Sequence, residues 1–160
     1  MSPKKNDTTP NLHAIQLVAF KVLELYIKVN QPLESADLKL DEEDFSIHTG
    51  HSKYNEENHT IAVKMEIEIG EEESQKSPLI LRVNIGGVFE VDETKFPIIH
   101  IEDWAKRNAP IILYPYLREQ VFALTVRCGY PGLILPLVTV PTIILEGPKK
   151  TARPKTKLKK

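Results

Sequence analysis

The chain has 160 residues, of which 41% are hydrophobic and 27% charged, ordinary proportions for one globular domain with a real core. The net charge of −1 hides an asymmetry: seven basic residues and no acid follow Glu146, which leaves 14 basic against 22 acidic residues, a charge of −8, in the rest of the chain. A single cysteine, Cys128, excludes an internal disulfide framework and favours a reducing compartment. No signal peptide or bilayer-spanning run is predicted, so we expect a cytoplasmic protein without membrane insertion.

The first predicted elements are a disordered stretch, residues 1–10, and a long strand. From Ala14 to Val29 apolar residues alternate with period two, and the alternation slips by one residue at Leu23, as a β-bulge would produce. A helix over the same stretch is the alternative. Phe45 to His51 predicts a second, short strand, and residues 55–58 predict a turn.

The strongest periodic signal is the strand predicted over Thr60 to Gly70, in which every second residue is apolar. After a polar hairpin loop, residues 71–77, the stretch from Leu79 to Val91 predicts a fourth strand. Gly86 and Gly87 lie in its middle and indicate a bulge or a close approach of the backbone. Successive strands followed by helices predict an α+β fold: a four-stranded antiparallel sheet with a long helix packed on one face.

The last third of the chain is predicted to be helical and then extended. His100 to Asn108 predicts a short helix, and Ala109 to Cys128 predicts a long one. An extended, aliphatic segment with several prolines, residues 129–141, follows. We therefore expect one domain over residues 11–146 and a flexible basic tail over residues 147–160.

The long helix has two apolar faces and only narrow polar stripes, one of which carries Arg118 and Thr125. One sheet covers only one apolar face, so the other is expected to meet a second copy of the chain. The alternative is that the segment after the helix folds back over it. One face holds Leu113, Tyr114, Leu117, Val121 and Leu124; the other holds Ile111, Ile112, Tyr116, Phe122, Ala123 and Val126, with Glu119 as its only charge. We expect a homo-oligomer, a dimer or a tetramer, whose interface holds Leu113, Leu117, Val121 and Leu124.

No catalytic motif is present, so neither an enzyme nor a cofactor is predicted. His48, His51 and His59 suggest a metal site by their spacing, but solvated histidines are the favoured interpretation, and no metal is predicted. Cys128 is more simply a packed cysteine than a reactive one. The basic tail lacks interleaved aromatic residues, so ordered recognition of nucleic acid is not predicted.

Three ordered motifs give the chain a resemblance to the family of the bacterial export chaperone SecB. The stretch from Pro110 to Glu119 resembles the start of the family's long helix, and Gly86-Gly87-Val88-Phe89 resembles a motif of its fourth strand. The third motif consists of Arg127, Tyr130, Pro131, Leu133 and Leu135. The resemblance spans Leu17 to Val138 and implies dimers that pair into tetramers, with the helices between two sheets.

The function implied by this resemblance is that of a holdase, which keeps unfolded polypeptides bound in apolar grooves without ATP. The clients are export preproteins or a dedicated partner such as an antitoxin. Apolar burial is non-directional, and weak contacts repeated around an oligomer add by avidity, so little sequence specificity is needed. The positions implied for the groove are Phe45, Ile47, Tyr130, Leu133, Ile134 and Leu135. The alternatives are an interaction module or regulator of the same fold that binds one partner, and a binder of a small apolar ligand.

The chain departs from the family at two places. The family docks the motor SecA on an acidic sheet surface, and the matching positions here are Glu24, Lys28, Ile80 and Arg82. Only Glu24 is acidic, and charge reversal at such a contact weakens docking, so a role as a dedicated antitoxin chaperone fits at least as well as export. The chain also ends in Gly147-Pro148 and lysines, where the family has a second helix and an acidic tail.

Overall fold

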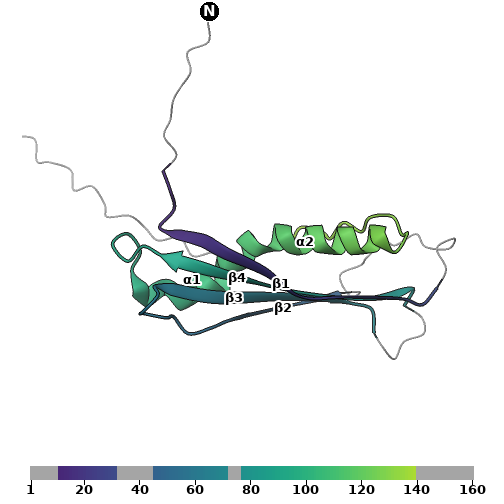
Figure 1. The fold of residues 1–160 in the computed structure, drawn as a ribbon, viewed down its shortest axis with the longest axis horizontal. Helices are drawn as coiled ribbons and strands as arrows, with labels where there is room; N and C mark the ends of the chain where they lie inside the picture. Colours follow the sequence, from purple (N-terminus) through teal and green to yellow (C-terminus); the bar gives the residue numbers. More distant parts are fainter. Residues whose placement is uncertain (1–10, 32–44, 72–76, 140–160) are drawn as a thin grey trace, which may run out of the picture.

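The computed structural model describes residues 11–31, 45–71 and 77–139. Its strands form one antiparallel sheet in the order β1-β4-β3-β2, and the long helix α2 lies on one face of this sheet (Figure 1). The predicted α+β class is confirmed. Residues 1–10 and 147–160, predicted to be disordered or flexible, lie outside the described residues. The elements are β1 (Ile15–Val29), β2 (Phe45–His51), β3 (Thr60–Ile69), β4 (Leu79–Val91), α1 (Ile101–Arg107) and α2 (Ala109–Arg127).

β1 is a strand along its whole length, so the helical alternative is wrong. It pairs with β4, and the register slips between Val22 and Glu24, which confirms the bulge expected at Leu23. A second slip lies between Leu17 and Ala19 and was not predicted. Because side chains of a strand alternate between faces, each slip resets which residues of β1 face the helix.

The core lies between the sheet and α2. The five alternate apolar residues of β3 are all buried, as the period-two pattern predicted: Ile61, Val63, Met65, Ile67 and Ile69. They belong to the same buried cluster as one face of α2. Full burial of one such side chain contributes about 1.5–3 kcal/mol, so this layer supplies much of the stability of the fold.

The face of α2 that we expected at an oligomer interface lies inside the chain instead. Leu113, Leu117 and Val121 are 0% exposed and Leu124 is 8% exposed, and all four pack in the core of the same chain. The assignment of these four residues to an interface is therefore wrong, because the chain's own sheet covers that face. On α2, only the opposite face is left open to a second copy.

Gly87 is the position at which α2 approaches β4 closely, as the glycine pair predicted. A Cβ on Gly87 would fall 2.8 Å from Leu113 Cδ2 and 2.9 Å from Leu17 Cδ1. Gly86 points to the other face of the sheet, where the side chain of the bulged Leu23 lies 3.4 Å from the position of a Cβ. The absence of a side chain at Gly87 therefore lets Leu113 of α2 lie directly on β4.

The short helix predicted before α2 is confirmed as α1. It follows one turn of 3-10 helix, Ile98–His100. Its Trp104 is buried and packs edge-on against Phe89, with ring centroids 5.2 Å apart. No helix within the described ranges is long and apolar enough to cross a membrane.

Residues 130–139, which we call the strap, run back along one flank of α2 (Figure 1). Gly129 takes the left-handed conformation that ends many helices (φ 83°) and reverses the chain. The hydroxyl of Tyr130 donates to the carbonyl of Gln31 at 2.7 Å, and the Leu133 amide donates to Thr125 Oγ1 at 3.0 Å. The predicted extended segment is thus confirmed up to Thr139, and the alternative that it folds back over the helix holds for one flank.

Candidate binding surfaces

The second apolar face of α2 is open to solvent in the single chain. Its large residues, which we call the outer helix face, are between 38% and 48% exposed: Ile111, Ile112, Tyr116, Phe122 and Val126. Glu119 lies exposed among them and Ala123 is half-buried. The helix therefore has the unpartnered apolar face that its sequence predicted, and such a face is typical of an association site.

The strap extends this apolar surface at one flank. Ile134 is 68% exposed and Leu137 is 84% exposed. Leu133 and Leu135, on either side of Ile134, point inward and are buried. The strap thus alternates as a strand does, with one side in the core and the other in solvent.

The positions implied for a groove are only partly at the surface. Tyr130, Leu133 and Leu135 are core residues, so their assignment to a groove is wrong: neighbours of the same chain already cover their side chains. Ile134 is exposed. Phe45 and Ile47 are half-buried and pack against the core from β2.

The other flank of α2 lies beside β1, an edge strand whose one described neighbour is β4. The ring of Phe20 packs against the ring of Tyr116, with centroids 4.8 Å apart. Val22 and Leu25 pair with core-facing residues of β4 and are nevertheless exposed. β1 therefore projects beyond α2 and continues its apolar surface. A long edge strand with free backbone groups and aliphatic side chains favours pairing with another chain.

Arg118 lies on the flank of α2 that faces the strap. Its Nε is buried and has no hydrogen-bond partner among the described residues. Its guanidinium carbon lies 6.0 Å from the centroid of the Tyr114 ring. Burial raises the pKa of the Tyr114 phenol, and the nearby positive charge of Arg118 partly offsets that shift. The sequence placed Arg118 on a polar stripe and gave it no role.

The face of the sheet opposite α2 brings together the four residues that the sequence analysis expects at a motor-docking surface. Lys28 lies opposite Ile80, and Arg82 Nε donates to Glu24 Oε1 at 2.9 Å. The Arg82 guanidinium also lies over the ring of Tyr26, 5.0 Å from its centroid. Glu24, the one acid retained, therefore has its charge balanced by Arg82.

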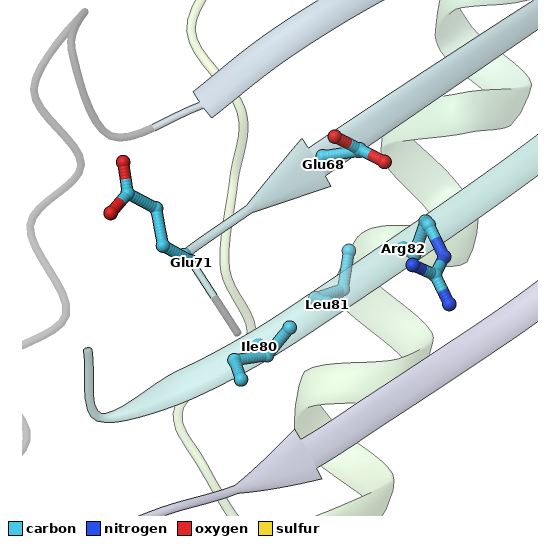
Figure 2. A pocket seen from close by; sticks show the side chains of 6 residues that line it. Glu68, Glu71, Ile80, Leu81 and Arg82 are labelled. Atoms are coloured by element: carbon cyan, nitrogen blue, oxygen red, sulfur yellow. The ribbon is translucent and has the colours of Figure 1, made fainter. Parts of the chain in front are cut away.

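A pocket of about 290 Å³ opens on the same face, at the end of β3 and the start of β4 (Figure 2). Figure 2 shows the side chains of Glu68 and Arg82 standing on the sheet in front of α2, with Glu71 just beyond the end of β3. The lining mixes two carboxylates, one guanidinium and apolar groups: Glu68, Gly70, Glu71, Ile80, Leu81 and Arg82. This set has no nucleophile with an adjacent base.

The three histidines of the suggested metal site do not form one in the described part of the chain. The carboxylate of Glu93 accepts hydrogen bonds from the hydroxyl of Tyr54 at 2.7 Å and from His59 Nδ1 at 2.9 Å. The hydrogen bond from His59 and, after it, the one from Tyr54 lower the pKa of the Glu93 carboxylate. Burial of the Tyr54 hydroxyl, followed by its hydrogen bond to Glu93, raises the pKa of Tyr54 to about 12. His51 bonds instead with the carbonyl of Ser52. No group of three His, Cys, Asp or Glu residues that could hold a metal occurs within the described ranges.

Comparison with known proteins agrees with this arrangement. Residues 15–143 match the model of the family described as preprotein translocase subunit SecB. An uncharacterised protein of Methanocaldococcus jannaschii is 36% identical over 87 residues, a match that covers 54% of each chain. The chain thus matches about half the length of this curated relative.

Two solved structures align with the chain to different degrees. The SecB-like chaperone Rv1957 of Mycobacterium tuberculosis, solved in complex with a ChAD peptide from the HigA1 antitoxin, aligns with a TM-score of 0.63 and 18% identity over 78% of this chain and 91% of that one. A protein of unknown function from Streptococcus agalactiae aligns with a TM-score of 0.42 and 12% identity over 77% and 97% of the two chains. The family match covers most of the chain, and the sheet with its long helix is the fold of a SecB-like chaperone; the chain belongs to the SecB family.

Proposed function

We propose that this protein is an ATP-independent holdase chaperone, which binds unfolded polypeptide on the apolar surface formed by α2 and the strap. The observation that carries the proposal is that α2 and the strap, which run alongside each other (Figure 1), both expose large apolar side chains: Ile111, Phe122 and Val126 from α2, and Ile134 and Leu137 from the strap. Membership of the SecB family supports a chaperone-like role, which requires no catalytic site.

The chemistry of this surface suits an extended, sequence-tolerant ligand. Apolar burial contributes about 25 cal/mol per Å² and has no preferred direction, so different apolar side chains bind alike. The surface is long because the strap runs along α2 from Tyr130 to Thr139. An extended polypeptide can therefore make many weak contacts, which add up when several copies of the chain bind one client.

A homo-oligomer is the second part of the proposal. The flank of α2 beside β1 carries Ile112 and Tyr116. Tyr116 packs against Phe20 of the edge strand, which also exposes Val22 and Leu25. We assign this flank to a second copy of the chain and the strap flank to the client. With this division, the second copy and the client bind different apolar regions of the chain and do not compete.

A dedicated client such as an antitoxin is favoured over export preproteins. The mycobacterial chaperone with the same fold was solved with a peptide of an antitoxin. The Glu24–Arg82 ion pair balances the charge of Glu24, the one acidic residue among the four positions expected to dock SecA. Binding of unfolded segments does not depend on that face.

The test is an aggregation assay without ATP, run alongside size-exclusion chromatography with light scattering. The purified chain should suppress aggregation of several chemically denatured, unrelated proteins at near-stoichiometric ratio, and should elute as a dimer or tetramer. Ile134→Ser with Leu137→Ser should reduce suppression. Ile99→Ser is the matched control, since Ile99 is 86% exposed outside this surface. One tight partner without any suppression would instead indicate a binding module, and a monomer without suppression would refute both parts of the proposal.

A further inference from the structure

The pocket between the end of β3 and the start of β4 carries an excess of negative charge. Its charged lining residues are Glu68, Glu71 and Arg82, which surround the apolar side chain of Ile80 (Figure 2). The charge of Arg82 is already balanced by Glu24, which lies 2.9 Å from it. Neither Glu68 nor Glu71 has a side-chain ion pair or hydrogen bond within the described residues. Two carboxylates of the pocket can therefore attract a cation.

The cation that suits this lining is the ammonium group of a lysine. A metal ion takes more oxygen ligands than two carboxylates supply, and no group of three such ligands occurs in the part of the chain that the structure describes. A lysine keeps its charged end in water and lays its aliphatic stem on apolar surface. Ile80, which is 4% exposed, supplies an apolar floor between the carboxylates.

The chain itself carries a run of lysines. Its basic tail, residues 147–160, lies outside the described residues; it holds seven basic residues and no acid, against a charge of −8 in the rest of the chain. Opposite charges of similar size attract each other. A segment tethered to its site also has an effective concentration on the order of millimolar, so it competes well against a free basic partner.

The tail is long enough to reach the pocket. The last described residue is Thr139, because the strap runs back along α2 toward the N-terminal end of the helix (Figure 1). The pocket lies near the other end of α2: Tyr130, which follows the helix, donates to the carbonyl of Pro78, where β4 begins. α2 is about 28 Å long and an extended chain spans about 3.3 Å per residue, so residues from Lys155 onward reach the pocket around the sheet edge.

We propose that this pocket binds a lysine of the chain's own tail, from residues 155–160, and that the tail thereby covers the sheet face opposite α2. Ile80 and Arg82, two of the positions expected to dock SecA, line the pocket. A bound tail would therefore keep another basic partner from this face. The proposal does not depend on the holdase function, because the client surface lies on the other side of the sheet.

The experiment uses the full chain as Cys128→Ser, with a nitroxide attached to Leu158→Cys in the tail. Paramagnetic relaxation enhancement of backbone amides, measured by NMR, then reports which part of the chain the tail visits. At low salt the Leu81 amide, in the pocket, should be broadened several-fold more than the Glu57 amide. An unbound tail should give the opposite order, because the turn at Glu57 lies at the end of the sheet toward which the strap runs. At about 1 M salt, where the Debye length is about 3 Å, the preference for Leu81 should disappear.

Two pairs of substitutions test the carboxylates. Glu68→Gln with Glu71→Gln should lower the enhancement at Leu81 about fivefold, which corresponds to about 1 kcal/mol from two exposed ion pairs. Glu56→Gln with Glu57→Gln makes the same charge change at an exposed turn and should leave the enhancement at Leu81 unchanged. Equal effects of the two pairs would show a general attraction to an acidic chain, and the pocket assignment would fail.

The remaining outcomes separate the sources of the cation. An isotope-labelled chain without the nitroxide, mixed with an unlabelled chain that carries it, should show no enhancement at Leu81. Enhancement in this mixture would assign the pocket to the tail of a second copy and overturn the proposal. Stronger broadening at Glu57 than at Leu81 in the first sample overturns it as well. If an added lysine-rich peptide of unrelated sequence then shifts the Leu81 amide, the pocket belongs to a different basic protein. Suppression of aggregation is measured separately, so failure of this proposal and failure of the holdase function are distinguishable.

Discussion

Arg82 of β4 forms an ion pair with Glu24 of β1, with 2.9 Å between Arg82 Nε and Glu24 Oε1, on the sheet face that α2 leaves uncovered. The two side chains are 33% and 41% exposed, so the pair contributes at most about 1 kcal/mol to stability. Its main effect is on the charge of the surface, because a carboxylate that is paired within the chain attracts a basic partner less strongly.

The first prediction concerns this surface. Purified SecA should bind the wild type weakly or not at all, and Lys28→Glu with Arg82→Glu should introduce binding that weakens steeply between low and physiological salt. Calorimetry at two salt concentrations measures both. Tight binding of SecA by the unmodified chain would show that the pair does not limit docking.

The second prediction concerns the contact between α2 and β4. Gly87→Ala should destabilise the protein by about 1–3 kcal/mol, because the added methyl group overlaps Leu113 and Leu17 in a packed core. Gly50→Ala, where no atom lies within 4 Å of a Cβ, is the matched control and should change stability by less than about 0.5 kcal/mol. Urea denaturation gives both values, and equal effects of the two substitutions would contradict the close approach.

The third prediction separates the two faces of α2. Leu117→Ala should cost about 2–5 kcal/mol, as expected for a buried leucine. Ile112→Ser should leave the unfolding of the protomer nearly unchanged but reduce the oligomer mass measured by light scattering. An Ile112→Ser variant of undiminished mass at low micromolar concentration would remove this flank from the proposed interface.

The fourth prediction concerns the attachment of the strap. Thr125 is fully buried, and its Oγ1 accepts the hydrogen bond of the Leu133 amide at 3.0 Å. Thr125→Val keeps the shape but leaves that amide without an acceptor, which should cost about 1–3 kcal/mol. Hydrogen exchange of the Leu133 amide should accelerate in the valine variant and much less in Thr125→Ser, which keeps the hydroxyl. Unchanged exchange in both would show that the bond does not hold the strap.

The fifth prediction is a pH dependence at Glu93. The pKa of this carboxylate lies below its ordinary value of 4.5 because His59 and Tyr54 donate hydrogen bonds to it. A pKa that is lower in the folded protein means that the stabilisation is present in full above pH 4.5 and is lost as the pH falls through the folded-state pKa. Glu93→Gln should therefore be less stable than the wild type at pH 7, and the gap should close at acid pH. A gap that widens on acidification has the wrong sign for this mechanism.

The strands and helices were predictable because each half-buried element leaves a period in the sequence. The alternation from Ile61 to Ile69 and the slip at Leu23 both reflect which side chains the sheet buries. The second slip, near Val18, was missed because apolar residues on both sides of it mask the change of phase.

The site was harder to predict because a helical wheel carries no tertiary information. Both faces of α2 are apolar, so the wheel alone does not tell which one meets the sheet, and the buried face was assigned to the interface. The useful signal is the stripe formed by Arg118 and Thr125. Polar residues on a helix that has no broad solvent-facing polar side indicate where another backbone segment runs alongside. Thr125 accepts a hydrogen bond from the strap, and Arg118 of the same stripe has a buried Nε.

The manner in which the strap is fastened has a mechanical consequence. Beyond Tyr130, the side chains of Thr125 and Tyr114 make the hydrogen bonds that join the strap to the rest of the described chain. No β-ladder runs along the strap within the described residues. Each bond contributes on the order of 1 kcal/mol and can open singly, whereas a ladder would open only as a unit. The strap can therefore open locally when a bulky client side chain binds, while the sheet behind α2 stays folded.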